Sequence, residues 1–165
     1  MKIDEGYIEV PGGRVWYRSV GAGGTPLLCL HGGPGFTHYY LEPLEALADR
    51  RQVIFYDQLG CGRSDTPDDP TLWTVGRFVE ELVQVRAALG LDRLHLFGNS
   101  WGGMLAMQYA LDRRPALVSL ILNGSPASMI RWVEDCDELL REEPPEVLQV
   151  IREHEAGGFT ACPEY

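Results

Sequence analysis

Short apolar runs of four to six residues recur along the first 125 residues and predict buried strands. Four runs are nearly continuous, as expected for strands that are covered on both faces of a sheet. They are Pro26–Leu30, Gln52–Tyr56, Leu94–Phe97 and Leu117–Leu122. Near the N-terminus, Tyr7–Val10 and Arg14–Arg18 alternate in character around Pro11-Gly12-Gly13, which predicts a β-hairpin.

Between these runs, apolar residues recur at three- and four-residue spacing, the period of an amphipathic helix. The longest example begins after Thr74, a candidate N-cap, and stops at Gly90. Its apolar positions are Val75, Phe78, Val79, Leu82, Val83 and Leu89. Leu41–Ala48 and Met104–Leu111 are shorter examples. Strands that alternate with helices predict an α/β fold, with a mostly parallel sheet and helices on both of its faces.

The pattern changes after Pro126, where the strand signals stop. Ser128–Leu140 and Glu146–Glu155 predict two acidic amphipathic helices, which Pro144-Pro145 separates. We therefore expect two domains. Residues 1–126 form the N-terminal part of the α/β core, and residues 127–165 form the beginning of a helical cap.

The net charge of −10 is spread unevenly along the chain. Residues 1–130 carry 14 acidic and 11 basic side chains, whereas residues 131–165 carry 10 acidic and 3 basic ones. Nucleic-acid binding needs a basic patch, so we expect no nucleic-acid partner. The acidic tail either favours a cationic substrate or is only the solvated face of its helices.

No apolar run approaches the roughly 20 residues that span a bilayer, so we expect no membrane partner. The charged N-terminal residues include no apolar signal segment, which predicts a cytoplasmic protein. The cysteines have irregular spacing and predict free thiols, with neither a disulfide framework nor a metal site. They are Cys29, Cys61, Cys136 and Cys162.

The strongest chemical signal is Gly98–Gly103, which matches G-x-S-x-G with Ser100 at its centre. The motif lies between an apolar strand and a helical stretch, the context in which a tight turn lifts the serine hydroxyl above the sheet. Such a hydroxyl becomes a nucleophile when a base removes its proton. The alternative is a glycine-rich turn that carries an incidental serine.

The second signal is His31–Gly35, which follows the strand that ends at Leu30. In the α/β-hydrolase fold, this loop and the residue after the nucleophile each donate one backbone N–H to an oxyanion hole. We assign these donors to Gly33 and Trp101. Each such donor stabilises the transition state by roughly 3 kcal/mol. A phosphate-binding loop is disfavoured, because G-x-x-x-x-G-K-[ST] is missing.

His31 precedes Ser100, whereas the catalytic histidine of this fold follows the nucleophile. We therefore expect His31 to support the loop together with Gly32, Pro34 and Gly35, although it could also serve as the base. The third signal, Asp57–Asp65, follows a strand and contains two turn glycines. Its predicted role is structural, with Asp57 bracing the loop of the oxyanion hole.

Together, the motifs His-Gly-Gly-Pro-Gly, Asp-Gln-Leu-Gly-Cys-Gly-Arg-Ser and Gly-Asn-Ser-Trp-Gly-Gly resemble the prolyl iminopeptidase family of the α/β-hydrolases. The resemblance extends to the Pro-Pro-Glu and His-Glu-Ala-Gly-Gly segments of the predicted cap. It implies a serine aminopeptidase that releases N-terminal proline, or another N-terminal residue, from short peptides. It also implies Ser100 as nucleophile and catalysis with neither metal nor organic cofactor. In that family cap glutamates hold the free amine of the substrate, and we assign none of them here.

The chain departs from the catalytic order Ser, then Asp or Glu, then His. Asp112, Asp135, Asp137 and His154 follow Ser100, but none comes after a predicted late strand. We expect the core to be incomplete, with the acid and base supplied by a C-terminal remainder of the same polypeptide or by a second chain. An esterase or amino-acid amidase of small molecules, and an inert fragment that needs such a segment, are the alternative functions.

Overall fold

The computed structural model describes residues 2–158 and divides the chain into two compact units. These are Met1–Ser125 and Pro126–Tyr165. The division falls one residue before the boundary that we place at 126/127.

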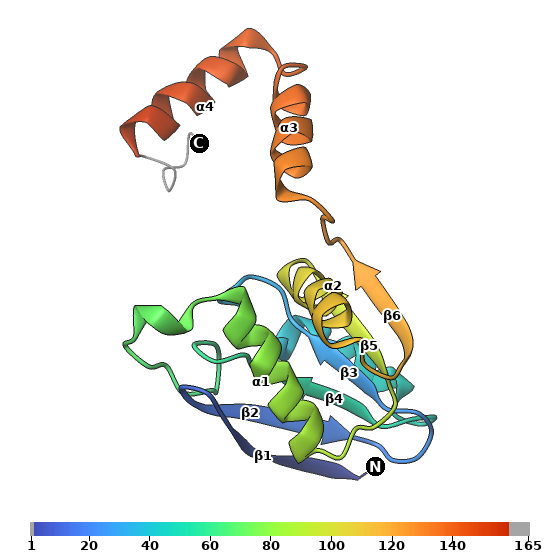
Figure 1. Cartoon of the computed structure of the whole chain (residues 1–165). Coiled ribbons are helices and arrows are strands. Elements are labelled where there is room, and N and C mark those ends of the chain that lie inside the picture. Colours follow the sequence, from blue (N-terminus) through green and yellow to red (C-terminus); the bar gives the residue numbers. More distant parts are fainter. Residues whose placement is uncertain (1, 159–165) are drawn as a thin grey trace. The chain divides into compact units, whose positions relative to one another are not determined.

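The first unit contains a six-stranded sheet with the strand order β1-β2-β4-β3-β5-β6 (Figure 1). Strands β1 and β2 form a hairpin, and β2 pairs antiparallel with β4. The pairs β4–β3, β3–β5 and β5–β6 are all parallel. The strands are β1 Ile3–Val10, β2 Gly13–Val20, β3 Leu27–Leu30, β4 Val53–Tyr56, β5 Leu94–Asn99 and β6 Leu117–Asn123. The predicted α/β class with a mostly parallel sheet is confirmed.

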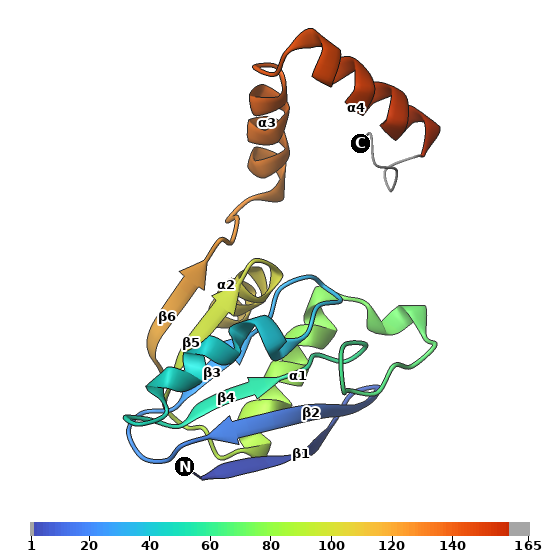
Figure 2. The same cartoon turned by 180° about the vertical axis from the view of Figure 1, so that it is seen from behind.

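Helices cover both faces of this sheet (Figures 1 and 2). The α-helices α1 (Val75–Ala88) and α2 (Trp101–Arg113) lie on one face, and the 3₁₀-helix η1 (His38–Leu47) lies on the other. Successive side chains of a strand point to opposite faces. Accordingly, Leu28 packs into the core under α1 and α2, whereas Leu27 packs into a second core under η1.

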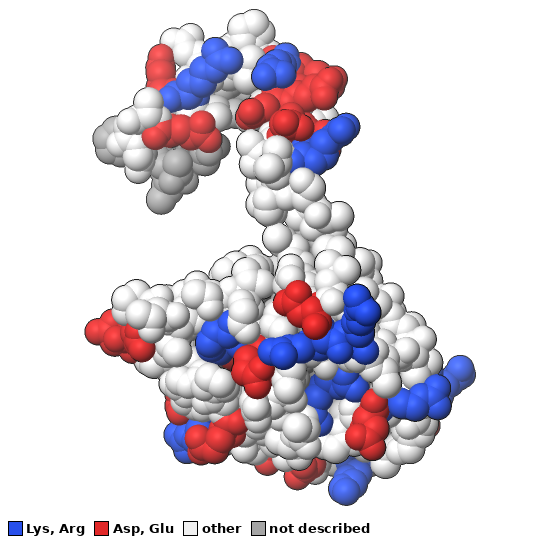
Figure 3. Space-filling view, viewed as in Figure 1, with Lys and Arg blue, Asp and Glu red and all other residues white. Residues whose placement is uncertain are grey.

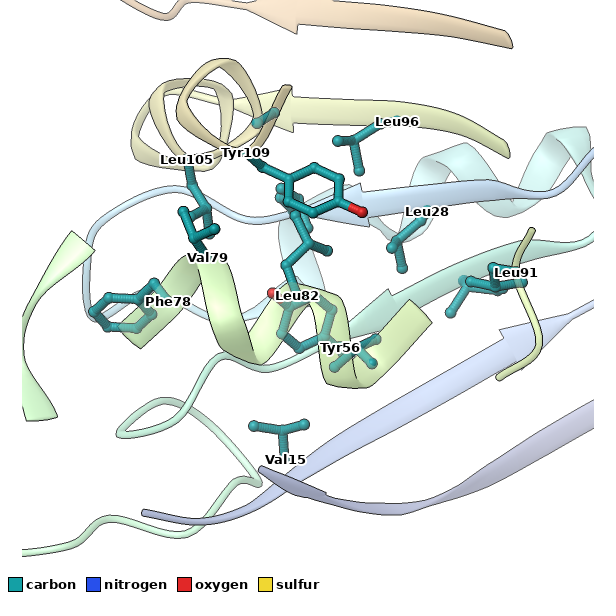
Figure 4. Packing of buried hydrophobic residues seen from close by; sticks show 14 of the residues in the cluster. Val15, Leu28, Tyr56, Phe78, Val79, Leu82, Leu91, Leu96, Leu105 and Tyr109 are labelled. Carbon is teal, nitrogen blue, oxygen red and sulfur yellow. The ribbon is translucent and has the colours of Figure 1, made fainter. Parts of the chain in front are cut away.

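The two cores together explain why the apolar runs are continuous, and Figure 4 shows the larger one. Leu82 of α1, Leu105 of α2 and Leu96 of β5 are fully buried in it. Burying a side chain of this size contributes about 1.5–3 kcal/mol. The face of α1 that the sequence predicts to be apolar is the face that meets the sheet.

Local signals explain the ends of α1 and the different geometry of η1. The Thr74 side chain accepts a hydrogen bond from the N–H of Arg77 at 3.3 Å, which caps the first turn of α1. After the helix, Gly90 has a φ of 63°, a conformation that glycine adopts without strain. The predicted helix at 41–48 is instead the 3₁₀-helix η1, and it contains Pro43, which lacks the N–H that an α-helix needs.

The second unit contains α3 (Met129–Leu140) and α4 (Pro145–Gly157). Figure 3 shows acidic side chains on this unit, with a few arginines among them. None of the described residues of this unit is buried, and Ile130 and Leu139 are 76% and 64% exposed. Within residues 2–158, no helix combines the length and the apolarity needed to cross a bilayer.

Candidate active site

Ser100 occupies the tight turn between β5 and α2. Its backbone angles are φ 50° and ψ −119°, outside the regions that non-glycine residues favour. Such a conformation costs about 1–3 kcal/mol and persists only where the surrounding structure enforces it. Here the N–H of Ser100 donates to the carbonyl oxygen of Asn123, at the end of β6, over 2.9 Å. The turn that the G-x-S-x-G motif predicts is therefore present.

Gly98 and Gly102, on either side of Ser100, are required because backbone atoms lie against them. A Cβ atom on Gly98 would lie 2.4 Å from the carbonyl oxygen of Gly102. A Cβ atom on Gly102 would lie 2.3 Å from the carbonyl oxygen of Leu30, and one on Gly103 would lie 1.9 Å from Ser125 Oγ. Since a side chain at position 98 or 102 would clash with backbone, the strand, the turn and the helix can pack closely only with glycine at these two positions.

The His31–Gly35 loop runs beside the serine. The Cβ position of Gly32 lies 3.2 Å from Ser100 Cβ, so this loop and the turn face each other. Among the described residues, none accepts a hydrogen bond from the N–H of Gly33 or of Trp101. Both amide hydrogens are thus available to a ligand atom, as an oxyanion hole requires.

A tyrosine that no sequence pattern indicates fixes this loop. The Tyr40 hydroxyl accepts a hydrogen bond from the N–H of Gly32 at 2.6 Å and donates to Asn99 Oδ1 at 2.7 Å. Asn99 Nδ2 in turn donates to Asn123 Oδ1 at 2.7 Å. Tyr40 therefore links η1 to the loop and to the residue before Ser100.

The ring of His31 is buried, and both of its nitrogens have partners. Nδ1 lies 2.8 Å from the carbonyl oxygen of Gly32, and Nε2 accepts the N–H of Gln58 at 2.9 Å. These partners require a neutral ring with its proton on Nδ1. Burial also lowers the pKa of His31. With both nitrogens engaged, His31 is placed to hold the loop rather than to take a proton from Ser100.

Gln58 ties the same loop to Trp101. Its Nε2 donates to the carbonyl oxygen of His31 at 3.0 Å, and its Oε1 accepts from Trp101 Nε1 at 2.9 Å. The two residues to which we assign the oxyanion-hole amides, Gly33 and Trp101, are thereby positioned through one buried side chain. Gln58 lies within the third motif, but its spacing alone gives no sign of this role.

Asp57 is buried, and both of its carboxylate oxygens have hydrogen-bond donors. Oδ1 receives the backbone N–H of His38 at 2.9 Å and lies 2.8 Å from His38 Nδ1, and Oδ2 receives the N–H of Arg63 at 2.9 Å. Burial by itself raises the pKa of Asp57, but the hydrogen bonds from His38 and Arg63 outweigh it and lower the pKa. A Cβ atom on Gly62 would lie 2.3 Å from Oδ2, which explains one glycine of this motif.

The other candidate residues lie outside this arrangement. His38 is buried against Trp16 with ring centroids 4.5 Å apart. His95 is half-buried on β5, with its Nδ1 2.7 Å from Ser119 Oγ. Cys61 lines a pocket, and burial raises its pKa to about 11, which keeps it a thiol.

An apolar pocket of about 520 Å³ adjoins the candidate site. The oxyanion loop contributes Pro34 and Gly35 to its wall, and the turn contributes Trp101. The remaining lining residues are Leu59, Gly60, Cys61, Thr66, Trp73, Thr74, Val75 and Phe78. Its volume falls within the range of small-molecule sites, roughly 300–1,000 Å³.

Within the part of the chain that the structure describes, no imidazole nitrogen or carboxylate hydrogen-bonds to Ser100 Oγ. No three side chains of His, Cys, Asp or Glu in residues 2–158 could together hold a metal ion. The described residues therefore place the Ser100 turn against the His31–Gly35 loop, without a histidine or carboxylate that bonds to the serine hydroxyl.

The sheet order and the strained serine between β5 and α2 indicate a class of protein. The alpha/beta hydrolase fold family matches residues 25–156, and the chain belongs to this family.

Relatives of known structure and name extend the similarity to the rest of the chain. A proline iminopeptidase of Heyndrickxia coagulans is 46% identical over 163 residues, which cover 98% of this chain and 57% of that protein. The crystal structure of a proline iminopeptidase of Mycobacterium smegmatis is 39% identical with a TM-score of 0.87, and that of VinJ is 37% identical with a TM-score of 0.90. Each structural match covers 98% of this chain and 57% of the other. The resemblance to prolyl iminopeptidases is confirmed, and the chain spans about 57% of the length of these relatives.

Proposed function

We propose that this chain supplies the nucleophile and the oxyanion hole of a serine hydrolase that releases the N-terminal residue, above all proline, from short peptides. The observation that carries the proposal is the strained turn at Ser100, which lies against the His31–Gly35 loop, together with the N–H groups of Gly33 and Trp101, which no described residue uses. The relatives named proline iminopeptidase support the hydrolase class and suggest the substrate.

In the proposed reaction, Ser100 Oγ attacks the carbonyl carbon of the scissile amide and gives its proton to a base. The N–H groups of Gly33 and Trp101 receive the negative charge that develops on the carbonyl oxygen. Collapse of this intermediate expels the leaving amine, which takes up the proton, and leaves an acyl-enzyme. Water then hydrolyses the ester and regenerates Ser100.

The acid and base of this reaction belong to a further proposal. We place them on a segment that acts with this chain, either a C-terminal continuation or a second chain. Exposed apolar residues on β6 support such a partner, since Val118, Ile121 and Leu122 are each 41–43% exposed. On this proposal neither a metal nor an organic cofactor takes part, and the substrate is a small peptide or an amino-acid derivative.

Covalent labelling tests the nucleophile. A fluorophosphonate probe is expected to add one adduct, at Ser100, to the chain combined with its completing segment, as intact mass and peptide mapping would show. Ser100→Ala should abolish the adduct, whereas Ser119→Ala on β6 should retain it. A folded, complete sample that does not react would contradict the proposal and support the inert alternative.

Substrate blocking separates the aminopeptidase from the other hydrolases. The acidic second unit, with seven more acidic than basic side chains in residues 131–165, suggests that the free amine of the substrate is recognised. Acetylation of that amine should therefore lower kcat/KM sharply. Equal turnover of free and acetylated proline anilides would instead favour an esterase or amidase of small acyl compounds.

A further inference from the structure

The pocket beside Ser100 is walled by aromatic rings. The rings of Phe78 and Trp101 meet edge to face, with centroids 5.6 Å apart. The ring centroids of Trp73 and Phe78 are 6.5 Å apart. No lining residue carries a charge, and apart from the indole N–H groups the polar side chains are two threonines and the Cys61 thiol. An ammonium group placed here would lack an anionic partner, so the pocket suits an apolar group and not the amine of a substrate.

The pocket is far larger than a prolyl ring needs. It encloses about 520 Å³, whereas the side chain of proline contributes only three methylene groups. Burying so few carbons would leave most of the wall without contacts, which lowers the binding energy that close packing supplies. A fused aromatic ring or a branched aliphatic chain matches this volume better.

Two side chains of α1, Arg77 and Glu81, hold the walls of the pocket in place. Arg77 lies over the Phe78 ring, with Cζ 3.8 Å from its centroid, and its Nε donates to the carbonyl oxygen of Leu72 at 2.9 Å. Glu81 accepts the N–H of Leu59 at 3.2 Å. These contacts anchor both the 59–61 wall and the segment that carries Trp73, so the pocket is preformed and its ligand meets little ordering cost.

We propose that this pocket receives a bulky apolar group of the substrate, larger than a prolyl ring, while the reacting carbonyl lies at Ser100. The inference rests on the proposed function only for the position of that carbonyl. The group belongs either to the acyl part or to the leaving amine, since the pocket is lined by Pro34 and Gly35, which follow Gly33, and by Trp101, which follows Ser100.

Binding without turnover tests the pocket itself. In the full chain carrying Ser100→Ala, 2-naphthol is expected to bind roughly 10- to 100-fold more tightly than cyclopentanol, the ratio expected for burying one large apolar group. Val75→Trp fills the rim and should remove most of this preference, as should Thr66→Trp. Leu111→Trp is the matched control, because Leu111 is exposed on α2 and does not line the pocket.

Circular dichroism shows whether Val75→Trp and Thr66→Trp fold. If one of the two variants does not fold, the other still tests the pocket. Equal binding of both alcohols, or a preference that neither folded filling variant reduces, would overturn the inference.

Kinetics with the completed enzyme then identify the group. One series varies the acyl residue on a constant anilide, and the other varies the leaving amine on constant proline. Val75→Trp should lower kcat/KM for the bulky members of one series only. If Ser100 reacts with the fluorophosphonate but neither series responds to Val75→Trp, the inference fails and the proposed function stands. If Ser100 does not react yet naphthol binding depends on Val75, the proposed function fails and the pocket stands.

Discussion

Glu81 is a buried carboxylate in an unusual setting. It pairs with Arg77 one turn earlier on α1, and its Oε2 also accepts the N–H of Leu59. Among the described residues, Glu81 Oε1, Arg77 Nη2 and the Tyr56 hydroxyl have no hydrogen-bond partner. Burial raises the pKa of Glu81 to about 7, although Arg77 opposes this shift.

This raised pKa predicts a distinctive pH dependence of stability. The folded state binds the proton of Glu81 more tightly than the unfolded state, where the pKa is near 4.5. The contribution of Glu81 is therefore full below pH 4.5 and is lost as the pH rises through 7. Relative to Glu81→Gln, the free energy of unfolding of the wild type should fall by about 3 kcal/mol between pH 4 and pH 8.

Urea denaturation of both proteins at several pH values measures this difference. Glutamine can still accept the N–H of Leu59, so the comparison isolates ionisation from the loss of that hydrogen bond. If the unfolding free energies of the wild type and of Glu81→Gln change in parallel between pH 4 and pH 8, the raised pKa of Glu81 is contradicted.

Gly102 permits the turn because it carries a hydrogen atom where other residues carry a side chain. Gly102→Ala would bring a Cβ atom to 2.3 Å from the carbonyl oxygen of Leu30, which is backbone and cannot move aside. We expect a loss of about 3 kcal/mol or more in unfolding free energy. Gly76→Ala is the matched control, because no atom lies within 4 Å of its Cβ position on α1. It should stabilise the protein by up to ~1 kcal/mol, as thermal or urea unfolding would reveal.

At the scale of elements, η1 connects to the site through one residue. Its 3₁₀ geometry places Tyr40 with its hydroxyl between Gly32 and Asn99, and the packing of Leu41 beneath holds the helix on the sheet. Helical periodicity indicated an element here, but it could not predict which side chain reaches the oxyanion loop.

Tyr40→Phe removes the hydroxyl and keeps the ring. The N–H of Gly32 then loses its partner, and the loop loses its link to Asn99. One such hydrogen bond contributes about 0.5–1.5 kcal/mol, so the rate of Ser100 labelling should fall roughly 3- to 10-fold. The control is Tyr39→Phe on the same helix, for which labelling should keep the wild-type rate. Equal rates for all three proteins would show that Tyr40 has no positioning role.

At the scale of the whole molecule, the outstanding feature is the amount of apolar surface left exposed on β6. Within the described part of the chain β6 pairs only with β5, and its other edge presents unpaired backbone. Val118, Leu120, Ile121 and Leu122 are each at least 36% exposed. An exposed apolar edge strand is a template for association.

We therefore expect the chain by itself to self-associate through β6. Ile121→Lys places a charge on that strand and should shift the chain towards monomer in light scattering at equal concentration. Ile130→Lys provides the comparison, because Ile130 is exposed on α3. This variant should leave the distribution of oligomers closer to that of the wild type. A monomeric wild-type chain at micromolar concentration would contradict this expectation.

Much of this protein follows directly from its sequence. The period of the apolar residues gave the strands and helices in order, since burial on one face imposes a spacing of 2.0 or 3.6 residues. The motif around Ser100 gave the strained turn, because backbone crowding there leaves no alternative to glycine. We expected the His31–Gly35 loop beside Ser100, and in the structure Gly32 lies next to Ser100.

Other features were decided only by the tertiary structure. The positions of Tyr40 and Gln58, the neutral state of His31, and the apolar pocket all depend on contacts between segments far apart in the chain. The burial of Glu81 was also decided by the tertiary structure, because the apolar pattern of α1 gives no sign of it. A side chain's hydrogen-bond partners and its desolvation depend on which distant residues surround it, and periodicity along the chain does not contain that information.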